Sequence, residues 1–279
     1  MTDEHGERML QVEGLTKEFA LRRSVGQRVQ RQEGQWHLAV DDVSFELRRG
    51  EILGLAGGSG SGKTTVARSL IRLTEPDAGQ VRLDGTDVLA ADRRELRGLR
   101  RRMQMVFQDP YSSLNPRMTV GAALHEAGKV HRRPGWEDKD AFVSRLLSLV
   151  QLSDRLASRK PRELSGGQRQ RVAVARALAV DPELIIADEA VSALDVSVQA
   201  QLLNLFQELR DELGVAILFI AHQLAVIAEL ADRIAVMHEG RIVEMGETKS
   251  VFEAPSDPYT KALLAAHPDP DPRHRSLLA

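Results

Sequence analysis

Apolar positions along this chain of 279 residues follow two periods, and the two alternate along the sequence. Compact apolar runs are typical of strands that are buried on both faces. They predict strands at 52–56, 184–187 and 215–220. A looser apolar–polar alternation predicts half-buried strands at 10–19, 40–47 and 81–83, and a hairpin that joins 234–238 to 241–244 through Glu239-Gly240.

Helical spacing fills the segments between these strands. It predicts helices at 64–73, from 165 to 180 with Ser165 as N-cap, and at 197–213 with Gly214 as the stop. A mostly helical stretch runs from Arg94 to about Ser158, broken at Pro110, Pro116 and Pro134. Strands that alternate with helices indicate an α/β fold around a largely parallel sheet.

Two segments carry no such period. Residues 21–37 are polar and are predicted to form an exposed loop, and the tail from Pro255 is rich in Pro and Asp and is expected to pack loosely. The predicted division is a main domain over 8–250, with a helical subdomain at about 95–180, followed by a C-terminal extension over 251–279.

Composition narrows the function classes. The net charge of −2 does not favour a nucleic-acid surface, and the absence of cysteine excludes disulfides, thiolate metal sites and a Cys-ligated cluster. No apolar run approaches the ~20 residues of a membrane-spanning helix. Residues 1–7 are polar and acidic, unlike a secretory signal, so any path across a membrane is expected to be formed by other chains.

A glycine-rich loop lies between the predicted strand at 52–56 and the next helix. Its residues fit the P-loop pattern G-x-x-x-x-G-K-[ST] and are Gly57, Gly58, Ser59, Gly60, Ser61, Gly62, Lys63 and Thr64. Backbone N–H groups at such a helix start point at phosphate. We expect them, with Lys63 and Thr65, to bind ATP, and Thr64 to bind Mg²⁺.

An acidic pair, Asp188-Glu189, follows the apolar run 184–187. The carboxyl ends of parallel strands face the crevice where ligands bind. Asp188 is expected to hold Mg²⁺, and Glu189 is expected to polarise the attacking water.

The segment Leu164-Ser165-Gly166-Gly167-Gln168, placed just before that acidic strand, resembles the ATP-binding cassette (ABC) ATPases. The resemblance implies a P-loop NTPase core with a mixed or parallel sheet, an antiparallel β subdomain and a helical signature subdomain. It also implies that Ser165, Gly166, Gly167 and Gln168 reach across a dimer to the partner's nucleotide, and that Asp195 links the two sites.

Three further roles follow from the same resemblance. His222 resembles the switch histidine that contacts the γ-phosphate. Gln108 resembles the glutamine that senses Mg²⁺ and water. Phe19 is the candidate for stacking on adenine, although Trp36, or simple strand packing of Phe19, would explain an aromatic residue there equally well.

Residues 103–120 and the tail 255–264 resemble the second ATPase subunit of the oligopeptide/dipeptide/nickel importers. The resemblance implies ATP-driven uptake at the cytoplasmic face of the plasma membrane, where the protein is peripheral. It implies four partners: a second ATPase subunit, identical or different, two permeases gripped by a groove with Tyr111, Leu114 and Met118, and indirectly a solute-binding protein.

The chain departs from this branch at Gly58, Gln223 and Lys160-Pro161-Arg162, and none of these departures removes a catalytic group. Two alternatives differ in class. A soluble mechanoenzyme that acts on nucleic acid or ribosomes would usually carry tandem cassettes or a long coiled coil. An exporter cassette would usually be fused to its membrane domain.

Overall fold

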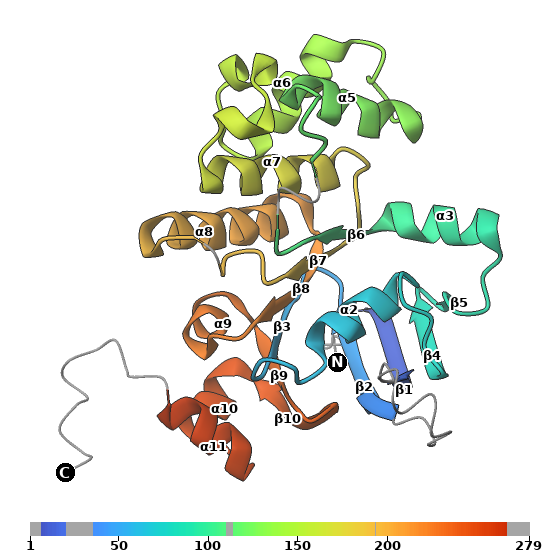
Figure 1. The fold of residues 1–279 in the computed structure, drawn as a ribbon, viewed down its shortest axis with the longest axis vertical. Helices are drawn as coiled ribbons and strands as arrows, with labels where there is room; N and C mark the ends of the chain where they lie inside the picture. The colour runs from blue at the N-terminus through green and yellow to red at the C-terminus, as the bar shows by residue number, and fades with distance from the viewer. Residues whose placement is uncertain (1–6, 21–35, 110–113, 193, 267–279) are drawn as a thin grey trace, which may run out of the picture.

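The computed structural model describes residues 7–20, 36–109, 114–192 and 194–266, and it is built around a six-stranded sheet with the strand order β10-β9-β3-β8-β7-β6 (Figure 1). All neighbouring strands are parallel except β10, which pairs antiparallel with β9. The strands are β3 (Ile52–Ala56), β6 (Met103–Val106), β7 (Leu184–Asp188), β8 (Ala216–Ala221), β9 (Arg233–His238) and β10 (Arg241–Glu247).

A second, antiparallel sheet has the order β2-β1-β4-β5. Its strands are β1 (Arg8–Ala20), β2 (Trp36–Arg48), β4 (Ala78–Leu83) and β5 (Thr86–Asp87). The prediction of a loop up to residue 37 is wrong at its end, because Trp36 pairs with Ala20 and His37 pairs with Phe19 in the β1–β2 ladder. The rest of that predicted loop, residues 21–35, lies outside the described residues.

Alternate residues of the central strands enter two separate cores. In β7, Ile185 and Ala187 pack with the helices α7 (Gly166–Leu178), α8 (Val196–Leu213) and α9 (Leu224–Leu230). Leu184 and Ile186 pack on the other face, with α2 (Lys63–Leu70) and the antiparallel sheet. The period of two in a parallel strand therefore gives the sheet two apolar faces, each covered by its own layer.

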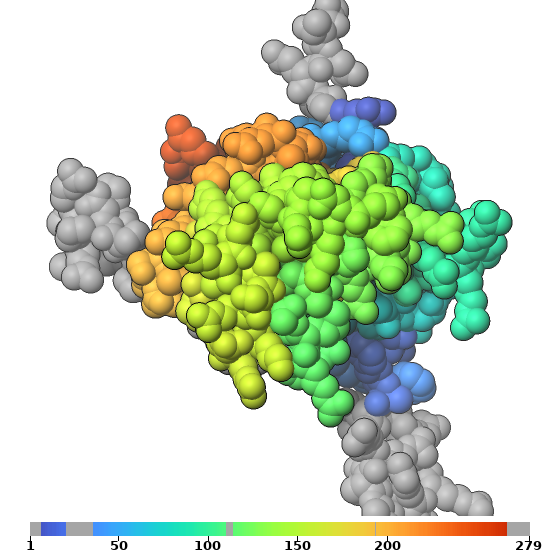
Figure 2. All heavy atoms as spheres, turned by 90° about the horizontal axis from the view of Figure 1, so that it is seen from above, coloured from blue at the N-terminus to red at the C-terminus, as the bar shows by residue number. Residues whose placement is uncertain are grey.

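The stretch from Arg94 to about Ser158, predicted to be mostly helical, is less uniformly helical in the structure. Its described residues contain α3 (Arg93–Arg102), α5 (Val120–Val130), α6 (Lys139–Leu149) and the short 3₁₀ helix η1 (Asp154–Ser158), and a second 3₁₀ helix, η2 (Pro161–Glu163), follows. The strand β6 interrupts it, because Met103 to Val106 pair with Leu184 to Ala187 of β7. Helices α5 and α6 stack beyond α7 in Figure 1 and form most of the face in Figure 2.

The C-terminal segment forms α10 (Thr248–Glu253) and α11 (Pro258–Ala265) against β10. The prediction of a loosely packed tail is wrong for residues 255–266. Asp257 caps α11, Pro258 stands in its first turn, and Thr260 is fully buried. Among the described residues, no helix has the length and apolar character needed to cross a bilayer.

Candidate active site

The glycine-rich loop joins β3, near the middle of the sheet, to the start of α2. Two of its glycines are required by close packing. A Cβ on Gly57 would lie 2.2 Å from the carbonyl oxygen of Met237, and a Cβ on Gly62 would lie 2.1 Å from that of Ala39. Gly62 also has a φ of 104°, which other residues rarely adopt. Close packing therefore excludes a side chain at both positions.

Lys63 extends its ammonium group back into this loop. Its Nζ donates to the carbonyl oxygens of Gly57 and Gly58, both at 2.8 Å, and to Ser61 Oγ at 3.2 Å. Burial lowers the pKa of Lys63, while the nearby charges of Glu189 and Asp188 oppose that shift. A buried cation whose direct partners are neutral oxygens, beside a helix N-terminus, fits the phosphates of a nucleotide.

Thr64 and Asp188 are in direct contact although they are 124 residues apart. Thr64 Oγ1 donates to Asp188 Oδ1 at 2.9 Å, and Asp188 is only 3% exposed. Burial raises the pKa of Asp188, and the charge of Glu189 adds to that rise, against the hydrogen bond from Thr64 and the charges of Arg68 and Lys63.

This oxygen pair fits a Mg²⁺ ion that also binds phosphates. Among the described residues, no group of three or more His, Cys, Asp or Glu side chains could hold a metal ion by itself. Mg²⁺ typically takes one or two protein oxygens, waters and substrate phosphates, so Thr64 and Asp188 match the donor set that it uses in nucleotide sites.

Glu189 follows β7 with a φ of 48°, an unusual conformation for a residue with a side chain. Its N–H donates to the carbonyl oxygen of Ile220, and its Oε2 accepts from Gln108 Nε2 at 2.8 Å. His222, which follows β8, lines a small cavity with Glu189 and Gln223. The parallel sheet thus brings Gln108, Glu189 and His222 together at the carboxyl ends of neighbouring strands.

A cavity of about 250 Å³ lies over the loop. Its lining contains Phe19, His37, Ala39, Gly60, Gly62, Lys63, Thr64, Thr65 and Glu189. His37 and Ala39 were missed from the sequence, although they alternate along β2. Trp36, the alternative to Phe19, does not line this cavity, and Ser59 is exposed at the tip of the loop.

The predicted signature residues lie at the start of α7 and do not line the P-loop cavity. Ser165 Oγ accepts from the Gln168 N–H at 3.2 Å, and Gln168 Oε1 accepts from the Ser165 N–H at 3.0 Å, which forms a capping box. Behind it, a Cβ on Gly167 would lie 2.3 Å from Val198, and a Cβ on Gly166 would lie 3.4 Å from Leu194. In one chain, therefore, these two groups of nucleotide-binding candidates do not share a cavity.

Asp195 is the N-cap of α8, and its neighbours Leu194 and Val198 face Gly166 and Gly167 at the start of α7. Its Oδ1 accepts from the Val198 N–H at 3.0 Å and from Ser197 Oγ at 2.7 Å. These hydrogen bonds, that from Ser197 first, lower the pKa of Asp195. Asp195 thus remains ionised at the surface, beside the start of α7.

A P-loop after the central strand β3, an acidic pair at the end of β7, two strands away, and a capped Ser-Gly-Gly-Gln helix define an ATP-binding cassette ATPase. The chain belongs to the ABC transporter family, whose model matches residues 40–192, and the model for the oligopeptide/dipeptide transporter C-terminal region matches residues 243–279. The α/β cassette fold inferred from the sequence is confirmed, and the chain is a transport ATPase with a nucleotide-binding fold.

Relatives cover most of the chain. It is 49% identical over 276 residues to a probable peptide ABC transporter ATP-binding protein of Sinorhizobium fredii, covering 96% of this chain and 75% of that protein. It is 48% identical to the glutathione import ATP-binding protein GsiA of Pectobacterium atrosepticum, covering 97% of this chain and 43% of that protein.

Solved structures agree with this membership. CbiO1 of Clostridium perfringens, part of the ABC transporter complex cbiONQ, has a TM-score of 0.75 and 26% identity, covering 89% of this chain and 92% of that chain. The cassette MJ0796, a dimer in a post-hydrolysis state bound to ADP and Pi, has a TM-score of 0.72 and 28% identity, covering 86% and 99%.

Proposed function

We propose that this chain is the ATP-hydrolysing subunit of an importer for peptides or a related small solute such as nickel or glutathione. One observation supports the proposal: the Thr64–Asp188 and Gln108–Glu189 contacts beside the P-loop occur in a chain that also has a C-terminal region of the oligopeptide/dipeptide transporter type. The relatives named above are a transporter subunit and an import subunit, and they give no support to the soluble mechanoenzyme.

The roles proposed for the P-loop follow from its contacts. Lys63 and the amides of Gly60 to Thr65 bind the phosphates of ATP, and Phe19 stacks on the adenine. Thr64 and Asp188, with Gln108 nearby, hold Mg²⁺, which would neutralise charge that develops on the phosphates.

The roles proposed for the residues at the carboxyl ends of the strands also rest on their contacts. Glu189 accepts the proton of the attacking water, and Gln108 holds the Glu189 carboxylate in place through the 2.8 Å hydrogen bond. His222 lines a small cavity with Glu189, and from there it would contact the γ-phosphate.

The proposal also requires a second ATPase subunit. Within one chain, the cavity that Lys63 lines is not lined by Ser165, Gly166, Gly167 or Gln168. Each nucleotide site would therefore be completed by these residues at the α7 N-terminus of the other subunit. Asp195 would lie beside that junction. Two permeases, reached at the cytoplasmic face of the plasma membrane, and a solute-binding protein outside would complete the assembly.

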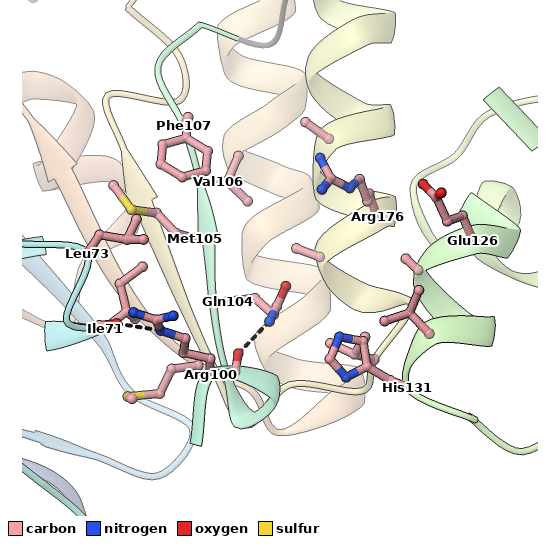
Figure 3. A pocket seen from close by; sticks show the side chains of 16 residues that line it. Ile71, Leu73, Arg100, Gln104, Met105, Val106, Phe107, Glu126, His131 and Arg176 are labelled. Atoms are coloured by element: carbon pink, nitrogen blue, oxygen red, sulfur yellow. Dashed lines mark hydrogen bonds between the residues drawn. The ribbon is translucent and has the colours of Figure 1, made fainter. Parts of the chain in front are cut away.

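A groove of about 340 Å³ beside β6 is the proposed permease contact (Figure 3). Leu73, Met105 and Phe107 lie on one side of β6, and Glu126, His131 and Arg176 lie on the other. Its apolar walls and charged rim suit an amphipathic helix, and β6 leads directly to Gln108.

The three groove residues expected from the sequence stand differently in the structure. Leu114 is 3% exposed and belongs to the core, so it does not offer a contact surface. Met118 is partly buried and does not line the groove, and Tyr111 lies outside the described residues.

The test is ATP turnover on assembly with the permeases and a loaded binding protein. We expect stimulation that is lost when the exposed groove residues are made acidic in Leu73→Asp and Val130→Asp, while Leu213→Asp, an exposed leucine at the end of α8, keeps it. Unchanged turnover on assembly of the wild type would contradict the importer function. Recovery of ribosomes or nucleic acid, instead of permeases, in a pull-down from the native membranes would do the same.

A further inference from the structure

Tyr259, in the C-terminal helix α11, contacts the P-loop directly. Its Oη accepts a hydrogen bond from the Gly58 N–H at 2.9 Å, across 201 residues of sequence. The space at Gly58 is shaped by this contact, since a Cβ there would lie 3.1 Å from Tyr259 Oη. The hydroxyl is therefore a fixed neighbour of the loop that binds nucleotide.

The bonded N–H belongs to the peptide unit that joins Gly57 to Gly58. In a trans peptide, the N–H and the C=O of the same unit point in opposite directions. Here the N–H points at Tyr259, and the Gly57 carbonyl oxygen points at Lys63 Nζ, 2.8 Å away. One peptide plane thus connects the tyrosine hydroxyl on the outside of the loop to the ammonium group on its inside.

A peptide between two glycines needs such an external partner. No Cβ restricts either side of it, so the plane can rotate at little steric cost. Rotation would turn the Gly57 carbonyl away from Lys63 and remove one of the three acceptors that hold the ammonium group. The hydrogen bond from Gly58 to Tyr259 opposes that rotation.

Tyr259 is itself held firmly. Its ring stacks on that of His238, at the end of β9, with centroids 3.7 Å apart and planes inclined by 18°. Glu244 on β10 accepts from the Ser256 N–H at 2.7 Å, from Ser256 Oγ at 2.8 Å and from the Asp257 N–H at 3.1 Å. These bonds fasten the start of α11 to the sheet, so Tyr259 reaches the loop from a fixed base.

We propose that Tyr259 is a positioning residue for the nucleotide site: by holding the Gly57–Gly58 peptide plane, it keeps Lys63 oriented for phosphate. The C-terminal extension then contributes to the nucleotide site, and its sequence also identifies the transporter type. This inference rests on the proposed function of the P-loop as the ATP site.

Tyr259→Phe tests the proposal, because it keeps the ring and its stack on His238 but removes the acceptor. The first measurement is hydrogen exchange in the nucleotide-free protein, followed by peptide mass. We expect faster exchange in the peptide that covers residues 53–62, with no change in peptides that cover α11. The second is ATP affinity, by titration, which we expect to fall about three- to tenfold, the effect of one hydrogen bond.

Ser250→Ala is the matched control, since it removes an exposed hydroxyl from the neighbouring helix α10. It should leave both measurements unchanged. Wild-type exchange in the 53–62 peptide of Tyr259→Phe would overturn the proposal. Faster exchange in α11 as well would also overturn it, because the tyrosine would then only dock the tail. If the wild type failed to bind ATP, the proposed function would fail, while the exchange comparison would still decide the role of Tyr259.

Discussion

Gln108 Nε2 lies 2.8 Å from Glu189 Oε2, so the side chain that follows β6 holds the carboxylate that follows β7. The two strands are paired neighbours at one edge of the sheet. Gln108 also stands near the start of the connection from β6 to α5, and both of these elements line the groove. A movement of that connection would therefore reach the proposed base through a single hydrogen bond.

Glu189→Gln should keep ATP binding and abolish turnover. The amide has nearly the same shape and can still bond Gln108, but it cannot accept a proton from water. We expect a loss of about 10²- to 10⁴-fold in turnover, measured as phosphate release, with a closed dimer that accumulates with ATP in size-exclusion chromatography. Glu212→Gln, an exposed glutamate on α8, is the control. Normal hydrolysis by Glu189→Gln would show that the base is another group.

Asp188→Asn should stabilise the protein when metal and nucleotide are absent. Burial raises the pKa of Asp188 above 3.8, so the folded state binds the proton more tightly than the unfolded state. The destabilisation therefore grows as the pH rises from 3.8 through the raised pKa, and it is complete above that pKa. Asn should raise the Tm at pH 7 in a chelator, and the gain should shrink as the pH approaches 3.8. An equal gain at every pH would contradict this account.

Phe19→Ala should weaken ATP binding more than Trp36→Ala. Phe19 is 41% exposed and lines the cavity over the P-loop, whereas Trp36 is 65% exposed and does not line it. Loss of a stacking partner worth about 0.5–1.5 kcal/mol corresponds to roughly a two- to tenfold loss of affinity. Titration with ATP measures both variants, and Phe19→Tyr should behave like the wild type. A larger effect of Trp36→Ala would move the stacking role to that residue.

Ser165→Ala should impair the dimer without weakening nucleotide binding by the single subunit. It removes one half of the capping box and should cost about 1 kcal/mol at the start of α7. We expect reduced ATP turnover and dimer formation with unchanged ATP affinity of the single subunit. Ser153→Ala, which removes the cap of η1, is a control with a similar local cost. If the two variants lost turnover equally, the proposed contact of Ser165 across the dimer would be wrong.

Glu244→Ala should release α11 from the sheet. Burial favours the protonated acid, but the hydrogen bonds from Ser256 and Asp257 outweigh it and lower the pKa of Glu244 from 4.5 to about 2. The stabilisation is therefore complete above pH 4.5 and is lost as the pH falls toward 2. At pH 7 we expect a loss of about 1–2 kcal/mol in unfolding free energy and faster hydrogen exchange in α11. Glu253→Ala, exposed on α10, is the control, and unchanged exchange in α11 would rule out this clamp.

Much of the central sheet could be predicted from the sequence because buried strands carry a local apolar signal. The β6 strand was missed because Met103-Gln104-Met105-Val106 is short, follows an arginine-rich helix, and is a strand only through its pairing with β7. Trp36 and His37 were missed for a related reason, since their partners Ala20 and Phe19 stand across a polar insertion.

The candidate site was more predictable than its surroundings. The P-loop and the acidic pair are short motifs whose chemistry depends on neighbours in sequence, and the parallel sheet then brings them together. The bond from Gly58 to Tyr259 spans 201 residues, and the polar composition before Pro258 gives no sign of it. Leu114 was misread as surface because its burial is decided by the core that it joins.

The insertion that carries α5 and α6 leaves the sheet from β6 and returns to it at β7, and these two strands lie side by side. Because these strands are parallel, the insertion leaves at the carboxyl end of β6 and crosses over, through α7, to the amino end of β7, at the edge of the sheet farthest from β10. The main contacts of α5 and α6 are with each other, α7 and η1, so these helices can be exchanged as a unit. A chimaera that takes residues 114–163 from a related cassette should keep the P-loop, the acidic pair and the Tyr259 contact, while it changes which membrane partner the subunit accepts.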